Sequence, residues 1–486
     1  MRRAGILLLA TVLGAPAAAQ SRLFVGARNL GMGGTGVGSS TDALAVYFNP
    51  AGMAFGAGFE VEVPLVTAEA EINGDLFNEV DQIDDLFDAK SLDEIQDALN
   101  DGTATREDLQ TVLQAFLYEV PDLEGETEGA AVRGSAGPAF RYRNWGVSLS
   151  LAGNGGADGK VDLTAALALG AAGFAGAIPD PMPAACAGDT VCLDLADQLV
   201  AAGGGALDPA RAEELVAAAG PALASDPRAQ ELLIDIVEAT AQGGATLADN
   251  QSAAITTGIL VSQLAFSYSH QVLGDKLAVG GNAKLMRGET YFQVTSVAAL
   301  EDGEQTLEDI LDTENTRSDT QVGLDLGVMY RPWPKVSFGL VGNNLNSPAF
   351  ELSQDRGEIE FDPLFRVGAA YRPWTWFNIA ADLDLNEVDS SVVSDHGHRY
   401  ANLGVEFLAG RFFQGWLGAY SNLARSETEP SITGGFGFGI GRFTIALAAA
   451  VALDDVQVAS GEDDQSYPRG AAASLQLGFR PGKNAG

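Results

Sequence analysis

Residues 321–386 contain the pattern that decides the fold of this chain. The segment opens Gln321-Val322-Gly323-Leu324-Asp325-Leu326-Gly327-Val328-Met329-Tyr330, in which an unbroken apolar series alternates with Gln, Gly, Asp and Met. The alternation recurs over residues 378–386, where Asn and Asp occupy positions between the apolar residues. We call these intervening positions the second series. A period of two is typical of a β-strand with one apolar face. Asp opposite a continuous apolar face indicates that the apolar face meets lipid while the polar face lines a wet lumen. The predicted fold class is therefore all-β, a transmembrane antiparallel β-barrel.

Strand-like segments continue along the chain, and about fourteen can be counted, an even number as bacterial single-chain barrels require. Their connections alternate between short and long, as expected for short periplasmic turns and long extracellular loops. All the tryptophans lie at or near short turns, where an interfacial aromatic girdle is expected. The predicted strands are residues 58–70, two strands meeting at 141–146, then 252–270, 275–298, 316–331, 335–345, 362–373, 376–387, 397–409, 412–424, 431–439, 442–455 and 467–480.

The N-terminus indicates export. Met1-Arg2-Arg3, an apolar run over residues 6–13 and Ala17-Ala18-Ala19 predict a signal peptide over residues 1–19. The apolar run is too short to span a bilayer as a helix, and no later segment is a convincing transmembrane helix. We therefore expect a barrel over residues 57–480, a C-terminal tail over 481–486, and a location in the outer membrane of a Gram-negative bacterium.

Residues 20–56 are rich in glycine and small polar residues and are predicted to form a hatch, or plug, inside the barrel. Gly31, Gly33 and Gly36 match the G-x-G-x-x-G pattern of dinucleotide sites, but no βαβ unit surrounds them, so the match is interpreted as accidental. Asn49-Pro50 followed by Gly52 predicts a turn. The residues expected to shape the hatch are Gly31, Gly33, Gly34, Asn49, Pro50 and Gly52.

Two long insertions are predicted to be helical, at about residues 75–128 and 155–250. Ser91 with Glu94 forms a capping box, and Asp208-Pro209 and Asp226-Pro227 are typical helix starts, with Gly220 following a helix end. Cys186 and Cys192 lie close together in an exported segment, so a small disulfide loop is favoured over a metal or redox site.

The formal charge of −37 argues against direct nucleic-acid binding, because phosphate attracts the opposite charge. Acidic residues concentrate in the predicted long loops, at residues 81–88, 301–309 and 462–464. They are interpreted either as solubilising groups or as sites for divalent cations shared with lipid phosphates, with outer-membrane lipid and lipopolysaccharide as the expected surroundings. Polar residues of the second series are expected to face the lumen, where they hydrate it or bind the plug. These are Asn282, Lys284, Asp325, Asp382, Asp384, Asn402 and Glu406.

No catalytic motif, cofactor motif or metal motif stands out, so an enzyme is not expected. His396 and His398 are two residues apart in a polar segment and are interpreted as an exposed loop rather than a metal site. The last strand ends in Leu475, Leu477 and Phe479, which resembles the terminal signal that the barrel-assembly machinery reads.

Two sets of segments carry a family resemblance. Residues 27–37 and 49–52 resemble the N-terminal hatch of the FadL-type outer-membrane transporters. Residues 344–348, 365–372 and 380–386 resemble a branch of that superfamily labelled conjugal transfer TraF-type proteins. The resemblance covers nearly the whole mature chain apart from the second insertion.

This resemblance implies passive uptake of hydrophobic or amphipathic small molecules across the outer membrane, with such a molecule as ligand. The TraF-type label implies an alternative, a structural or assembly component of a conjugation or secretion apparatus that binds its proteins. A third interpretation is an adhesin that presents the second insertion.

Overall fold

The structure is a computed structural model. It describes residues 24–56, 58–73, 90, 98, 105–114, 117–118, 129–160, 186, 189–204, 207–241, 253–296, 316–353, 357–389, 397–410, 412–425, 429–460 and 463–480. The predicted signal peptide, the Ser91–Glu94 capping box, His396 and the acidic runs at 81–88 and 301–309 lie outside these residues.

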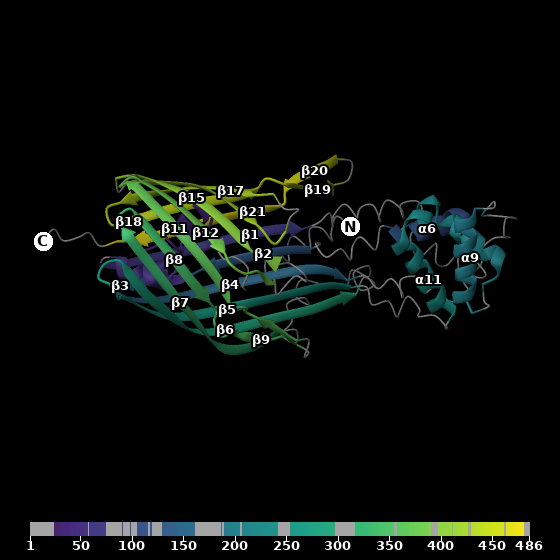
Figure 1. Cartoon of the computed structure of the whole chain (residues 1–486), viewed down its shortest axis with the longest axis horizontal. Coiled ribbons are helices and arrows are strands. Elements are labelled where there is room, and N and C mark those ends of the chain that lie inside the picture. The colour runs from purple at the N-terminus through teal and green to yellow at the C-terminus, as the bar shows by residue number, and fades with distance from the viewer. Residues whose placement is uncertain are drawn as a thin grey trace.

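One antiparallel sheet closes on itself to form the barrel (Figure 1). The sheet has 15 strands, but β2 and β3 occupy one position in the wall, because both pair with β1 on one side and β4 on the other. The wall therefore has the 14 positions that the strand pattern predicts, and this prediction is confirmed. The wall strands are β1 (Phe59–Asn73), β2 (Gly129–Ala136), β3 (Ala139–Tyr142), β4 (Trp145–Lys160), β5 (Ala253–Gln271), β6 (Leu277–Ser296), β7 (Thr316–Trp333), β8 (Val336–Asn343), β11 (Leu364–Trp374), β12 (Phe377–Asp384), β15 (Tyr400–Ala409), β16 (Phe413–Asn422), β17 (Ser431–Ile440), β18 (Phe443–Ala452) and β21 (Gly470–Phe479).

The break between β2 and β3 lies beside an irregularity in β1. Gly137 has φ of 138°, and its N–H donates to the carbonyl of Pro64 at 2.9 Å. The register of β1 against β21 shifts between Pro64 and Val66, so Leu65 and Val66 both face outward. A bulge of this kind reverses the side-chain alternation beyond it. The simple alternation predicted for the first strand holds before the bulge and changes phase after it.

The two faces of the wall differ as predicted. On β7 the apolar series Val322, Leu324 and Leu326 is exposed on the outer surface, at 54%, 44% and 62%. On the inner face of the same strand Asp325 and Met329 are buried. A closed barrel satisfies its backbone hydrogen bonds internally, so this outer apolar face can meet hydrocarbon.

The tryptophans do not all belong to an outer girdle. Trp145, Trp333, Trp374 and Trp376 lie near short turns and are at least half exposed. Trp416 is only 2% exposed and lies on the inner face of β16, opposite Glu406 of β15. The expectation of an interfacial position is wrong for Trp416, because its register places the indole inward.

The N-terminal segment lies inside the barrel as a hatch. It contains α2 (Ala27–Gly31), α3 (Ala45–Phe48) and the 3-10 helix η1 (Pro50–Phe55). Its apolar side chains pack in three groups with inward-facing residues of the wall, including Trp416, Ala139 and Met329. The hatch adds no strand to the sheet, so it meets the wall through side chains rather than a continuous backbone ladder.

The helices of the long loops lie beyond one end of the barrel (Figure 1) and form a module of their own. Its elements are α6 (Arg106–Gln114), α9 (Thr190–Ala202), α10 (Pro209–Ala218), η4 (Pro221–Ser225) and α11 (Pro227–Ala241). The two insertions share one core, because Leu113 and Leu117 of the first pack with Leu199, Leu215 and Leu233 of the second. No helix among the described residues is long and apolar enough to cross a bilayer.

The predicted helix ends agree with the structure. Asp208 caps α10 by accepting from the N–H groups of Ala210 and Arg211 at 3.1 Å, and Asp226 caps α11 in the same way. Gly220 follows α10 with φ of 88°. The second insertion starts later than predicted, because β4 continues to Lys160. It ends close to the predicted position, since β5 starts at Ala253.

Three short hairpins occupy other long connections. They are β9 (Ala349–Glu351) with β10 (Glu358–Glu360), β13 (Val388–Asp389) with β14 (Gly397–His398), and β19 (Asp455–Ser460) with β20 (Asp463–Pro468). His398 was expected in an exposed loop, but it is 1% exposed and its Nδ1 lies 3.3 Å from the hydroxyl of Tyr400.

Candidate functional site in the barrel lumen

The hatch turn at Asn49 is anchored by the amide of that residue, which is fully buried. Its Oδ1 accepts from the N–H of Ala51 at 3.1 Å, which caps η1, and Pro50 takes the first helical position. Its Nδ2 donates to the carbonyls of Val37 at 3.1 Å and Val328 at 3.0 Å. One side chain therefore shapes the turn, ties it to another part of the hatch and fixes it to β7.

The predicted hatch glycines lie where a larger residue would not fit. Gly33 and Gly34 have φ of 64° and 86°, a region that favours glycine. A Cβ on Gly33 would lie 2.5 Å from the carbonyl oxygen of Ala419, and one on Gly52 would lie 2.1 Å from that of Ser40. Gly31 is less constrained, with 3.0 Å to Trp416 Cβ.

Asp382 binds the hatch backbone from the wall. Its Oδ2 accepts from the N–H groups of Gly36 at 2.7 Å and Val37 at 2.9 Å. Asp384, two residues later, binds wall residues instead: it pairs with Arg366 and accepts from the N–H of Tyr400 at 3.0 Å. The two aspartates have the same side-chain chemistry and face the same way, but the structure places only Asp382 against the hatch.

Glu406 is the centre of a buried ionic cluster. Arg28 of α2 donates to it twice, through Nε at 2.7 Å and Nη2 at 3.0 Å. Trp416 Nε1 also donates to Glu406 at 3.1 Å. Burial alone would lower the pKa of Arg28, but the adjacent carboxylate outweighs it and raises that pKa above the ordinary range. The hatch guanidinium therefore stays charged and paired at physiological pH.

Asn282, Lys284 and Asp325 form a third cluster on β6 and β7. Asn282 Nδ2 donates to the hatch carbonyl of Val46 and to Asp325, each at 2.8 Å. Lys284 Nζ lies 2.6 Å from Asp325. Asn402 is also buried, but its amide makes no hydrogen bond among the described residues. The predicted lumen set thus divides into hatch contacts (Asn282, Asp382 and Glu406), wall contacts (Lys284, Asp325 and Asp384) and Asn402.

Several hatch anchors are not in the predicted set. Thr433 receives the N–H of Gly33 and donates to the carbonyl of Gly31, each at 3.0 Å. Ser337 Oγ donates to the carbonyl of Gly38 at 2.6 Å, and Ser135 Oγ to that of Phe24 at 2.8 Å. These hydroxyls lie on the inner face of their strands, so strict alternation could have identified them.

Burial raises the pKa of Tyr47 in the hatch to about 12, so this phenol stays neutral.

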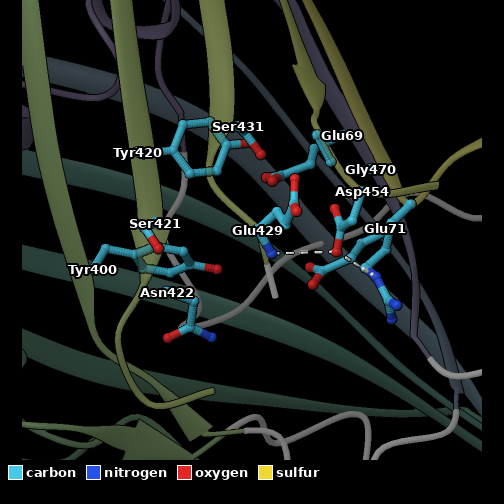
Figure 2. Close-up of a pocket in the computed structure, with 12 residues that line it drawn as sticks. Glu69, Glu71, Tyr400, Tyr420, Ser421, Asn422, Glu429, Ser431, Asp454 and Gly470 are labelled. Atoms are coloured by element: carbon cyan, nitrogen blue, oxygen red, sulfur yellow. Dashed lines mark hydrogen bonds and ion pairs between the residues drawn. The ribbon is translucent and has the colours of Figure 1, made fainter. Parts of the chain in front are cut away.

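A polar cavity of about 40 Å³ lies beside β1 and is lined from several strands (Figure 2). Glu69 and Glu71 face Tyr400 and Tyr420 across it, and Glu429 and Asp454 lie between them. The guanidinium of Arg133 lies 2.7 Å from Glu71 and 3.8 Å from Glu69. Sequence reasoning missed Glu69 and Glu71 because the bulge at Leu65 sets the direction of these two side chains. A second cavity of about 20 Å³ is lined by Arg28, Asp42, Glu62 and Arg480, among others.

Cavities of about 40 and 20 Å³ have room for a few water molecules and are too small for an organic solute. Within the described residues there is no group of three or more His, Cys, Asp or Glu side chains arranged to hold a metal ion. Among the charges that line the lumen, the described carboxylates Glu71, Asp325, Asp384 and Glu406 all have cationic partners. Asp382, by contrast, is held by the N–H groups of Gly36 and Val37.

An apolar region lies in the lumen where the connection between β8 and β11 meets the wall. Ile259 and Val261 of β5, Met286 of β6 and Ala131 of β2 face inward there. The β9–β10 hairpin covers them with Phe350, Leu352, Ile359 and Phe361. We call these four wall residues, together with Gly288, the apolar slot.

The structure joins Cys186 and Cys192 in a disulfide at the start of α9, closing a loop with a sequence separation of 6. The bond lies in the helical module and not in the lumen.

A family model described as "F plasmid transfer operon, TraF, protein" matches residues 46–384, more than two thirds of the chain. The chain belongs to this family. The resemblance predicted from the sequence, a FadL-type barrel nearest the TraF-type branch, is confirmed. The matched range of this TraF-type barrel begins within the hatch and ends at β12, so it includes both helical insertions.

Solved structures similar to the TraF-type barrel include the CymD monoaromatic hydrocarbon channel, at 12% identity and a TM-score of 0.48 over 95% of this chain and 98% of that one. The P. putida toluene transporter TodX gives 13% and 0.47 over 94% and 98%. A Pseudomonas aeruginosa FadL homologue gives 10% and 0.45 over 96% and 99%. Comparison with the curated proteins finds no match.

The closed wall with 14 positions and its outward apolar face make the TraF-type barrel a protein of the outer membrane of Gram-negative bacteria. The lipid bilayer is then the environment of the exposed side chains on its outer face.

Proposed function

We propose that this TraF-type barrel lets hydrophobic or amphipathic small molecules cross the outer membrane passively, through a lumen that the hatch closes. The observation that carries the proposal is the way the hatch is attached. Residues 24–56 fill the lumen but share no backbone ladder with the wall. They can therefore shift by exchanging side-chain hydrogen bonds while the barrel stays closed.

The anchors allow such a shift in steps. Arg28, Asn49 and the backbone N–H groups of Gly36 and Val37 bind Glu406, Val328 and Asp382, which lie on three different strands. Each contact has a net value of about 1 kcal/mol when neutral and more when charged. Breaking the contacts of the hatch with one strand therefore costs less free energy than breaking its contacts with all three strands.

The test is a liposome-swelling assay on barrels that lack residues 24–55. Deletion of the hatch is expected to raise the permeability to small solutes well above that of the full chain. An unchanged rate would show that the hatch does not close the lumen. Hydrophobic solutes are then compared with polar solutes of similar size in the full chain, where faster entry of the hydrophobic solute supports the proposed substrate class.

A second candidate function is a structural component of a conjugation or secretion apparatus. The observation that favours it is the helical module, in which two loops far apart in the sequence share one core. The matching family takes its name from a plasmid transfer operon, which suggests transfer proteins as partners. Crosslinking followed by purification separates the two: recovery of apparatus proteins supports this function, and retained lipid or hydrocarbon supports transport.

We also propose that the acidic loops contact lipopolysaccharide through divalent cations, which bridge the carboxylates and the lipid phosphates. The barrel-assembly machinery is a further proposed partner, during insertion into the membrane. Omitting divalent cations should then weaken lipopolysaccharide binding to the purified barrel.

A further inference from the structure

We propose that the apolar slot is a binding subsite for a small aromatic molecule, which Phe350 of the β9–β10 hairpin occupies in this structure. The inference rests on the proposed uptake function and names the class of solute that the route would take. It starts from the shape of the inner wall at Gly288.

Gly288 makes the slot deep enough for a ring. A Cβ on Gly288 would lie 2.3 Å from Cδ1 of Phe350, 2.7 Å from Cε1 and 2.9 Å from Cγ. The phenyl ring therefore lies directly over the glycine backbone. Val261 is the cross-strand partner of Gly288, and Ile259 is the partner of Thr290. The slot is a ring-sized recess bordered by aliphatic side chains.

Polar residues lie on both sides of the slot along β6. Along β6 the inward residues are Asn282 and Lys284, then Met286 and Gly288, and then Thr290. Asn282 and Lys284 belong to the cluster beneath the slot. Phe350 is fully buried in the slot, and Phe361 packs against it with ring centroids 5.3 Å apart. The slot therefore already holds one aromatic ring, and a second ring packs against the first at a tilt of 59°.

The hairpin differs from the hatch in how it is held. Thr290 donates to the carbonyl of Glu351 at 2.7 Å, and Arg317 pairs with the exposed Glu351 carboxylate. Ser353 Oγ donates to the carbonyl of Phe292 at 3.5 Å, and Phe350, Leu352, Ile359 and Phe361 pack in the same apolar cluster as the slot. A small aromatic molecule can replace the ring of Phe350 contact for contact. It would then release a hairpin whose exposed ion pair adds little stability.

The slot also lies where an incoming solute would meet it. The hairpin belongs to the connection between β8 and β11, one of the long loops, which the sequence predicts to be extracellular. The hatch contact of Asn282 lies six residues before Gly288 on β6, on the side of the short turn to β5. A solute that displaces Phe350 would thus be held above the hatch, in contact with Met286.

Photolabelling of the full-length barrel in liposomes tests the proposal. The probe is 3-phenyl-3-trifluoromethyl-diazirine, a small aromatic carbene source, and labelled residues are mapped by mass spectrometry. Phe350→Ala removes the internal competitor and is expected to raise labelling of Val261 and Met286 at least tenfold. Adding Gly288→Val to Phe350→Ala fills the recess and should return labelling to the level of the unsubstituted chain.

Leu285 provides an internal control, because it lies beside Met286 on β6 but is 52% exposed on the lipid face. Its labelling should be equal in all variants, which shows equal delivery of the probe to a folded barrel. Ala283→Val, also on the outer face, is the matched variant and should leave labelling of Met286 unchanged. Equal labelling of Met286 in Phe350→Ala and in the unsubstituted chain would overturn the proposal, and so would labelling that persists in the double variant.

The same preparations separate this subsite from the transport proposal. Labelling that depends on the slot, without entry of hydrophobic solutes, would leave the subsite standing and remove transport. Solute entry without labelling of Val261 or Met286 in Phe350→Ala would remove the subsite and leave transport standing.

Discussion

Arg28 in the hatch and Glu406 in β15 form a two-point ion pair inside the barrel, with N–O distances of 2.7 and 3.0 Å. The side chains are 13% and 5% exposed. They are 378 residues apart in the sequence, so the pair joins the N-terminal hatch to a strand near the C-terminal end of the chain. A buried pair contributes most visibly when one partner is removed, because the other is left charged and unpaired.

Glu406→Gln is therefore expected to loosen the hatch around α2. Loss of the carboxylate leaves Arg28 buried without a counter-charge, which costs about 3–5 kcal/mol. Hydrogen exchange measured by mass spectrometry should show a lower opening free energy for residues 27–37, with little change in the wall strands. The control is Glu289→Gln, which removes an exposed partner of Arg287 at 3.5 Å and should cost less than about 1 kcal/mol. Equal effects of the two substitutions would contradict this account.

Asp382→Asn should weaken a different hatch contact. The carboxylate oxygen Oδ2 accepts from both Gly36 and Val37, and a neutral amide is the weaker acceptor for two N–H groups. We expect these two amides to lose about 1–3 kcal/mol of protection against exchange.

Asp384→Asn is the matched control for Asp382→Asn, since it lies on the same strand and binds Arg366 rather than the hatch. It should change exchange near Tyr400, whose N–H it accepts, and leave Gly36 and Val37 as they are. Faster exchange at Gly36 in Asp384→Asn would mean that the wall, and not the direct contact, holds this part of the hatch.

The contrast between these aspartates shows how far the sequence predicts the site. Alternation places Asp382 and Asp384 on the inner face, and the even strand number and the loop alternation predict the barrel. Alternation cannot show which inward residue meets the hatch, because that depends on how a separate segment packs in three dimensions. The bulge at Leu65 also escapes a simple period of two. The nearness of Trp416 to a short turn does not show that its indole faces inward. The β9–β10 hairpin is only three residues per strand, too short to produce a pattern.

Lowering the pH should loosen the start of α6 in the helical module. Asp108 is a carboxyl that burial alone would give a raised pKa. Hydrogen bonds from Lys90 and Thr105 outweigh burial and lower the pKa of Asp108 below its usual 3.8. Lys90 Nζ lies 2.7 Å from Oδ1, and the N–H of Thr105 donates to Oδ2 at 2.7 Å. A carboxyl with a lowered folded-state pKa contributes stability above its unfolded-state pKa and loses it as the pH falls through its folded-state value.

Exchange at α6 should therefore rise as the pH is lowered below about 4, once corrected for the intrinsic pH dependence of exchange. Asp108→Asn should show the looser state already at neutral pH, by about 1 kcal/mol, with no further loss on acidification. The cap of α10 at Asp208, more exposed than Asp108, serves as the reference helix. A pH response that is the same in Asp108→Asn would assign the effect to other carboxyls.

Gly327→Ala should disturb the hatch without removing any polar side chain. A Cβ at this position on β7 would lie 2.1 Å from Oδ1 of Asn49, so the amide must move and release its bonds to Ala51, Val37 and Val328. Overpacking of this kind costs about 1–3 kcal/mol. Liposome swelling should be faster for Gly327→Ala than for the unsubstituted barrel.

Gly258→Ala on β5 tests whether that result is specific to Asn49. The added methyl would meet its nearest neighbour, the carbonyl oxygen of Asn154, at an ordinary 3.5 Å. The two variants make the same chemical change in neighbouring parts of the wall, and we expect Gly258→Ala to swell at the rate of the unsubstituted barrel. If both variants swell faster, strand stiffness controls the leak. If neither does, the Asn49 turn can be displaced without opening the lumen, and closure depends on the Arg28 and Asp382 anchors.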